Sequence, residues 1–254
     1  MKATVFKRGI LIAALGVLTL TVSLSPGVAS AQQNNDSNFR ITPYLWMLGV
    51  DGTTAVLGQD TDVDASFGDV LDVLNIALSV NMEWKTANNF FVVLDPLWAQ
   101  LEMDFATPAP PPIAGKVEIE LLIVDGLVGY EVNDKFDLYA GARYYDQDIK
   151  IVPSGMAPTI QLGDDWTDVI LGFRYHSQVG DKWSFAGRLD GAVAGDSDSA
   201  WYLQAAFLRH FGDNKHLDLG WRHYDVDYTS GAGISTFKWD VAHSGPVVGF
   251  SWEF

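Results

Sequence analysis

The stretch PVVGFSWEF, residues 246–254 at the end of the sequence, alternates between large apolar residues and small, polar or less bulky ones. A period of two places successive side chains on opposite faces of a β-strand. The face that contains the final residue is apolar and rich in aromatic side chains. It comprises Pro246, Val248, Phe250, Trp252 and Phe254, and the opposite face comprises Val247, Gly249, Ser251 and Glu253. The stretch therefore predicts a long strand with one strongly apolar side.

The same alternation recurs upstream in segments that are longer than ordinary strands. Apolar faces run over residues 76–84, 136–144, 169–175, 183–193 and 201–207. Strands of soluble proteins average about five or six residues, whereas a tilted membrane strand needs about 9–11. Trp84, Trp183 and Trp201 lie near the ends of these faces, as the aromatic girdles of membrane barrels do. We therefore expect strands that cross a bilayer.

The connections between these segments alternate in length. Short turns rich in Asn, Asp and Gly occupy residues 86–89, 132–135, 180–182 and 212–215. Longer connections occupy residues 59–75, 107–115 and 153–165, and shorter ones on the same rim lie near residues 196–199 and 229–235. Short turns on one rim and long loops on the other are typical of outer-membrane barrels. The fold class predicted is all-β, an up-and-down antiparallel transmembrane β-barrel of about ten strands, with eight or twelve as alternatives. Breaks in the alternation predict bulges near residues 98–100 and 243–245.

The N-terminus has the pattern of a secretory signal peptide. Lys2, Lys7 and Arg8 precede an apolar run over residues 10–24, and a small-x-small motif ends at Ala31. The run is shorter than the roughly 20 apolar residues that a membrane-spanning helix needs. We expect cleavage after Ala31, a disordered lead-in over residues 32–38 and a barrel over residues 39–254.

Composition excludes several classes of site. The 254 residues include no Cys, which excludes disulfides and thiolate metal sites. The net charge of −16 repels phosphate backbones, so we expect no nucleic-acid partner.

The C-terminal stretch resembles the last strand of bacterial outer-membrane barrels, in which a terminal aromatic residue is read by the barrel-insertion machinery. On this resemblance Phe250, Trp252 and Phe254 form the C-terminal insertion signal. Internal motifs resemble a family of small, functionally uncharacterised members of this class: Pro43-Tyr44-Leu45-Trp46, Trp183-Ser184, Gly220-Trp221-Arg222-His223-Tyr224 and Ser244-Gly245-Pro246. The resemblance covers essentially the whole chain. It implies a single barrel in the outer membrane of a Gram-negative bacterium, in contact with lipid and lipopolysaccharide, and it implies no substrate.

Charged residues fall opposite the apolar faces, so they would line the lumen. The predicted lumen residues are Glu83, Asp95, Asp125, Arg143, Arg174, His176, Arg188, Asp190, Arg222, Lys238 and Asp240. One interpretation is a self-neutralising network in a largely structural barrel, because unpaired buried ions are costly. The other is a narrow porin-like channel or pocket lined by the same groups. A soluble β-sandwich or lipocalin-like barrel is the alternative to the membrane fold itself.

Acidic residues gather in the predicted long loops. Asp60, Asp62 and Asp64 share one face of a strand-like stretch and are weak candidates for a metal site. The spacing fails as an EF-hand, because Ala65 and Leu71 stand where that loop needs Gly and Glu. A ligand- or lipid-binding barrel whose acidic loops face the exterior, with divalent cations that bridge to lipopolysaccharide, is thus an alternative function. No cofactor is expected.

The sequence offers no catalytic motif. Ser244 follows His243, and Asp225 lies two residues after His223, so a serine, a histidine and an acid could meet across strands. Neither Gly-x-Ser-x-Gly nor His-Glu-x-x-His occurs. We expect no catalytic residues, and an outer-membrane enzyme is the least favoured class.

Overall fold

A computed structural model describes residues 38–56, 59–106, 114–155 and 158–254. The predicted signal peptide, nearly all of the lead-in and most of the 107–115 loop lie outside the described residues. The elements are β1 (Asn38–Trp46), β2 (Gly49–Val56), β3 (Gln59–Ala65), α1 (Phe67–Val73), β4 (Leu74–Lys85), β5 (Phe90–Ala106), β6 (Ala114–Asn133), β7 (Phe136–Pro153), β8 (Ile160–Gly180), β9 (Trp183–Gly195), β10 (Ser199–His210), β11 (Lys215–Ser230), the short 3-10 helix η1 (Gly233–Ser235) and β12 (Phe237–Glu253). Neither α1 nor η1, the helices among these residues, is long and apolar enough to cross a membrane.

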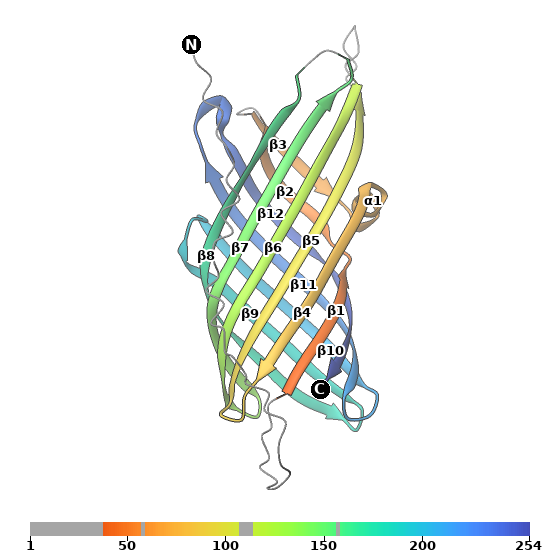
Figure 1. Ribbon diagram of the computed structural model, residues 1–254, viewed down its shortest axis with the longest axis vertical. Helices are drawn as coiled ribbons and strands as arrows, with labels where there is room; N and C mark the ends of the chain where they lie inside the picture. Colours follow the sequence, from red (N-terminus) through yellow and green to blue (C-terminus); the bar gives the residue numbers. More distant parts are fainter. Residues whose placement is uncertain (1–37, 57–58, 107–113, 156–157) are drawn as a thin grey trace, which may run out of the picture. The chain divides into compact units, whose positions relative to one another are not determined.

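Ten of the strands close into an antiparallel barrel (Figure 1). Each of β4 to β11 pairs with the next strand along the chain, and β1 closes the ring by pairing with both β4 and β12. At the seam, the backbone N–H of Phe254 donates to the Phe39 carbonyl at 2.9 Å, and the N–H of Phe39 donates back at 3.2 Å. Closure leaves no free edge in the membrane-spanning part, as lipid requires. The predicted ten-strand up-and-down barrel is confirmed.

The pairing register of the strands shows that both predicted bulges are wrong. Pairing of β11 with β12 runs without a shift from Lys215↔Trp252 to Ser230↔Phe237, so no bulge occurs at residues 243–245. Pairing of β5 with β6 is likewise continuous. The irregularity near residue 100 lies instead in the neighbouring strand, between Leu74 and Ile76 of β4.

The half of the wall nearest the short turns, which is the lower half in Figure 1, has an apolar outer face. On β6 the outward positions from Leu122 to Val132 are apolar and include Val128, which is exposed. Ten residues of strand separate Leu122 from Val132. At about 3.3 Å per residue and a tilt of about 45°, they span a height close to the ~25 Å of the apolar band of membrane barrels. Trp84, Tyr130, Trp183 and Phe207 are among the exposed aromatic residues of this half. The lower half therefore has the surface of a membrane-embedded barrel.

The polarity of the wall reverses above this band while the strands keep their alternation. On β6 the outward residues become Lys116, Glu118 and Glu120, whereas the inward ones become Val117, Ile119 and Leu121. On β12 the inward residues at this level are Phe237, Trp239 and Val241. A charged exterior around an apolar interior is the arrangement of a water-soluble fold.

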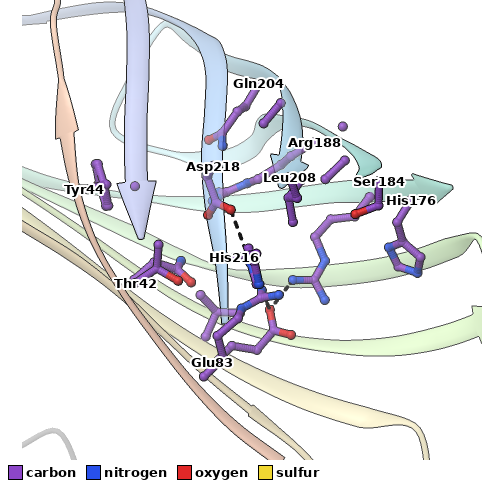
Figure 2. Close-up of a pocket in the computed structure, with 18 of the residues that line it drawn as sticks. Thr42, Tyr44, Glu83, His176, Ser184, Arg188, Gln204, Leu208, His216 and Asp218 are labelled. Atoms are coloured by element: carbon purple, nitrogen blue, oxygen red, sulfur yellow. Dashed lines mark hydrogen bonds and ion pairs between the residues drawn. The ribbon is translucent and has the colours of Figure 1, made fainter. Parts of the chain in front are cut away.

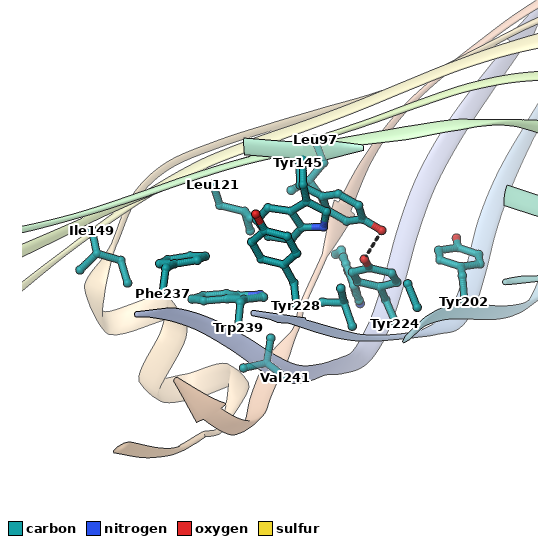
Figure 3. Packing of buried hydrophobic residues seen from close by; sticks show 14 of the residues in the cluster. Leu97, Leu121, Tyr145, Ile149, Tyr202, Tyr224, Tyr228, Phe237, Trp239 and Val241 are labelled. Atoms are coloured by element: carbon teal, nitrogen blue, oxygen red, sulfur yellow. Dashed lines mark hydrogen bonds between the residues drawn. The ribbon is translucent and has the colours of Figure 1, made fainter. Parts of the chain in front are cut away.

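The upper wall consists of two separate sheets, because the pairing of β4 with β5 and the pairing of β8 with β9 both end below it. Residues 102–106 of β5 lie beyond the last β4 pair, Leu74↔Leu101, and residues 160–167 of β8 lie beyond the last β9 pair, Asp168↔Gly195. One sheet is the upper part of β5–β8, and the other is the upper part of β11 and β12 with β2 and β3. Figure 3 shows the packing between them, with Leu121 and Tyr145 on one layer and Trp239 and Val241 on the other. The upper half is thus a β-sandwich continuous with the barrel.

Two segments expected to be long loops belong to this sandwich. The 59–75 connection contains β3 and α1, and the last part of the 153–165 connection is the start of β8. The alternation of Asp60, Asp62 and Asp64 indicates a strand-like stretch in the first segment, but its acidic composition favours a loop. This half therefore has the apolar core and polar exterior of a β-sandwich, whereas the barrel below it has an apolar outer surface.

Side chains close one open side of the sandwich. The rings of Trp166 and Tyr228 are stacked with centroids 4.1 Å apart, and the Tyr228 hydroxyl donates to Asp164 at 2.8 Å. Burial, together with this hydrogen bond, raises the pKa of Tyr228 to about 12, so the hydroxyl remains a donor at neutral pH. Helix α1 contacts β2 and β5 on the other open side. Its Ser66–Asp69 capping box satisfies the first N–H groups of the helix.

Candidate functional site: the lumen

The structure places most of the predicted lumen residues inside the barrel. Glu83, Asp95, Asp125, Arg143, Asp190 and Arg222 are buried there, Arg174 and Arg188 are mostly buried, and His176 is half-buried near the short-turn rim. Lys238 and Asp240 are not in the lumen, and their prediction is wrong. They lie on the outer face of β12, where Lys238 approaches Asp60 at 3.9 Å and Asp240 at 3.5 Å. The prediction assumed that apolar faces contact lipid along the whole strand, but at this height the apolar face points inward.

Two arginines and two aspartates form an ion-paired belt across the middle of the lumen. Arg143 on β7 binds Asp125 on β6 through Nε at 2.5 Å and through Nη2 at 2.9 Å, and it reaches Asp190 on β9 at 3.1 Å. Arg188 donates to Asp125 at 2.6 Å and to Asp190 at 2.9 Å. The Tyr139 hydroxyl accepts from Arg188 and donates to Asp190. The four charges neutralise one another, as buried ions must if they are to stay charged.

A second set of ion pairs lies nearer the short-turn rim. Glu83 accepts from Arg40 at 2.9 Å and also from Arg174, while Arg174 donates to Asp137 at 2.9 Å. The Arg174 guanidinium lies 3.9 Å from the centre of the Phe91 ring. Gly129 makes room for that ring, since a Cβ there would lie 2.1 Å from Phe91 Cζ. Sequence reasoning missed Arg40 and Asp137, although both alternate with apolar residues on their strands.

Aromatic side chains fill the lumen above the belt. Tyr145, Trp166, Tyr224, Tyr228 and Trp239 are all buried in the sandwich core, and the Tyr224 hydroxyl contacts the Tyr145 hydroxyl at 2.5 Å. Between belt and core remains a cavity of only about 30 Å³, which Arg143 and Trp46 help to line. A cavity needs about 10–15 Å³ of this kind of volume to hold one water molecule, so this one has room for only a few. The belt and the aromatic core together close the lumen.

A larger chamber of about 310 Å³ lies below the belt (Figure 2). In the figure Thr42 and Tyr44 approach it from one side and His176 and Ser184 from the other. Side-chain exposure rises from 2% at Arg143 to 35% at both His176 and Lys85, so the chamber opens toward the short-turn rim. Small inward residues, Ala186, Ala206 and Gly249, leave this space.

Arg222 lies at the inner end of this chamber and lines both cavities. Its Nε and Nη2 donate to Gln204 Oε1 at 3.1 and 3.0 Å, and its Nη1 donates to the Tyr44 hydroxyl at 3.0 Å. Tyr44 in turn donates to Asp95 at 2.8 Å. In the described part of the chain, no carboxylate lies within ion-pair distance of Arg222 itself. Arg222 therefore differs from Arg143 and Arg188, which bind carboxylates directly.

Two serine–histidine arrangements occur, and neither is a triad. Ser184 Oγ lies 2.7 Å from His210 Nε2 at the chamber wall, but across the described residues no carboxylate comes within ion-pair distance of His210. On the outer face of the barrel His223 pairs across strands with Ser244, whose hydroxyl accepts from Trp221 at 3.0 Å. The acid, Asp225, lies on the same face of β11, and no hydrogen bond joins the three side chains in this part of the structure.

The remaining predicted groups lie outside the lumen. Asp60, Asp62 and Asp64 alternate along β3 with exposed side chains, and Asp62 accepts from Thr53 at 3.3 Å. Over the residues that the structure describes, no group of three or more His, Asp or Glu is placed to hold a metal ion. Phe250 and Trp252 are in ring contact at 4.6 Å on the outer face of β12, beside the β1–β12 seam at which Phe254 pairs with Phe39.

Comparisons with known proteins agree on the fold. No protein-family model and no curated protein matches the chain. Among solved structures, the outer membrane protease OmpT from Escherichia coli matches with a TM-score of 0.58 at 6% sequence identity, over 89% of this chain and 99% of that one. The chain folds as an outer-membrane β-barrel. The translocator domain of the autotransporter NalP from Neisseria meningitidis also matches, with a TM-score of 0.51 at 11% identity, over 88% of this chain and 90% of that one. At these identities the chain shares a fold with both proteins, and no activity follows from the likeness.

Proposed function

We propose that this protein is a non-conducting outer-membrane barrel whose wall holds a packed β-sandwich outside the membrane. The observation that supports this proposal most is the filled lumen. The Arg143–Asp125–Arg188–Asp190 belt crosses it, and the aromatic core around Trp166 occupies the space above. Of the two interpretations that the sequence left open, this favours the largely structural barrel over the narrow porin-like channel.

The energetics of opening support the same choice. A water path would have to separate the belt, and a buried ion that loses its partner costs several kcal/mol. It would also have to displace stacked rings such as Trp166 and Tyr145, whose centroids are 4.6 Å apart. Ten-stranded barrels have interiors little wider than the eight-stranded ones that side chains just fill.

The route to the membrane is part of the proposal. The chain would be exported with a signal peptide that is cleaved after Ala31, and the insertion machinery would read the C-terminal strand at Phe254. Acidic positions on the outside of the sandwich, such as Glu118 and Asp240, would then face water and the lipopolysaccharide headgroups, where divalent cations could bridge the two. The intact mass of the purified protein, which should begin at Gln32, checks the export route.

Conductance in planar lipid bilayers tests the function directly. We expect insertions of the folded wild-type barrel to show no discrete current steps, because the lumen is filled. Folding is verified by heat-modifiable migration on gels, and a general porin in the same bilayers shows that insertion is detected. Arg188→Ala provides the internal probe, since it removes one member of the belt.

Discrete steps from most wild-type insertions, with an ion selectivity that changes in Arg188→Ala, would contradict the proposal. That result would show that ions pass through the lumen and would favour the porin-like channel.

A further inference from the structure

We propose that the chamber below the belt binds a small organic carboxylate, and that Arg222 is the residue that anchors its negative charge. The proposal goes beyond the closed barrel, because it concerns what occupies the space that the closed lumen leaves. It rests on three observations: the hydrogen-bond partners of Arg222, the volume of the chamber and the side chains that line it.

Arg222 is a buried cation without a direct counter-ion. It is 7% exposed, and its three side-chain hydrogen bonds go to neutral acceptors, Gln204 and Tyr44. Asp95 reaches it only through the Tyr44 hydroxyl and also accepts from Asn81 at 3.1 Å. Charges that are buried in proteins are normally paired with an opposite charge. A ligand carboxylate in the chamber would supply that pair.

Arg222 still has donors to offer. Its three bonds do not use all the N–H groups of a guanidinium, and a guanidinium matches the planar geometry of a carboxylate. The other arginines that line the lumen are already neutralised: Arg143 and Arg188 by the belt, and Arg40 and Arg174 by Glu83 and Asp137. Arg222, whose nearest carboxylate is Asp95 behind the Tyr44 hydroxyl, is therefore the cation of this chamber with N–H groups left for a ligand that carries one negative charge.

The chamber has room for an organic group beside the charge. Its volume of about 310 Å³ lies at the lower end of the range for small-molecule sites, ~300–1,000 Å³. The wall combines apolar side chains, Val93, Leu127, Leu208 and Val247, with the polar groups around Arg222. Its carboxylates include Glu83, which Arg40 and Arg174 bind, and Asp218, which lies 3.2 Å from His216. The small residues Ala186, Ala206 and Gly249 occupy inward positions, whereas large aromatic residues fill the positions above the belt. A space kept by small side chains next to an unpaired cation has the features of a binding site.

Calorimetry with benzoate tests the proposal on the full mature barrel in detergent micelles. Benzoate is the probe because it joins one carboxylate to a compact apolar ring, and benzamide is the uncharged control of the same shape. We expect benzoate to bind with saturable heat and benzamide not to bind. Arg222→Gln should weaken benzoate binding by about 10- to 100-fold, the size of a lost charge-assisted interaction.

Two further variants make the result specific. Arg209→Gln is the matched control, because Arg209 also forms no ion pair with any residue that the structure describes, but it lies on the outer face, 5.3 Å from the centre of the Trp183 ring. It should bind benzoate as the wild type does. Ala186→Phe fills the chamber without touching the charge and should abolish binding even if Arg222→Gln does not fold.

Absence of benzoate binding to the wild type at millimolar concentration would overturn the proposal. Unchanged binding of benzoate to Arg222→Gln or to Ala186→Phe would also overturn the proposal, because the site would then lie elsewhere. Equal binding of benzamide would overturn it because the site would not depend on the negative charge. Conductance tests whether the barrel is closed, and calorimetry tests whether the chamber binds a carboxylate. Failure of the proposed function and failure of this inference can therefore be told apart.

Discussion

Replacement of Asp125 by alanine should lower the free energy of unfolding by about 3–5 kcal/mol. The carboxylate accepts from Arg143 and from Arg188, and Arg143 is only 2% exposed. Its removal leaves two buried guanidinium groups to share Asp190. Urea titration of the barrel in lipid vesicles, followed by tryptophan fluorescence, measures the change.

The matched control for this variant lies on the same strand. Glu118 of β6 pairs with Lys150 of β7 at 2.8 Å, but the two side chains are 42% and 44% exposed. Exposed pairs contribute between about 0 and 1 kcal/mol, so Glu118→Ala should change stability by less than about 1 kcal/mol. Equal effects of the two variants would contradict a buried, structurally essential belt.

Replacement of Trp166 by alanine should open the sandwich while the membrane-embedded barrel stays intact. Trp166 is buried, stacks between Tyr145 and Tyr228, and donates from Nε1 to Ser197 at 3.0 Å. Loss of a buried tryptophan costs about 3–5 kcal/mol. Because strand pairing between β8 and β9 ends at Asp168, this loss falls on the side of the wall that only side chains close.

Limited proteolysis of vesicle-embedded protein measures this effect. We expect cleavage of Trp166→Ala in the upper strands and protection of the lower ones by lipid. Trp221→Ala is the control, since Trp221 is a large aromatic residue that is 53% exposed on the outer face of β11. The account fails here if Trp166→Ala resists protease as the wild type does, or if both variants are cleaved alike.

The barrel could be predicted because its signals are local. Alternation and short polar turns between strands fix which residues pair, so ten strands followed from the sequence. The sandwich could not be predicted in the same way. The side chains of β12 alternate without a register shift while its apolar side changes from outward at Phe250 to inward at Trp239. In the sequence this change is seen as a break in the alternation near residues 243–245, where the sequence alone predicts a bulge. Period alone does not say whether an apolar face contacts lipid or a protein core. That ambiguity placed Lys238 and Asp240 in the lumen.

The partners within the lumen were also beyond the sequence. Arg143 reaches Asp190 from β7 to β9, and Glu83 on β4 meets Arg174 on β8 across the interior. Which inward residues face each other depends on the tilt and stagger of the strands around the barrel, and these quantities belong to the closed ring as a whole. Alternation along each strand identified the inward residues, and the geometry of the closed barrel determines which of them form ion pairs.

Cysteine accessibility along β6 tests the central claim, that one wall is a lipid-facing barrel below and a closed sandwich above. The chain has no cysteine, so single substitutions from Lys116 to Val132 can be labelled with a water-soluble maleimide in vesicles. We predict labelling at the outward positions Lys116, Glu118 and Glu120, protection at the outward positions from Leu122 to Tyr130, and protection at the inward position Ile119. Labelling at Val128, or at Ile119 as readily as at Glu120, would contradict the account, because the first would place the lower wall in water and the second would place water inside the upper half.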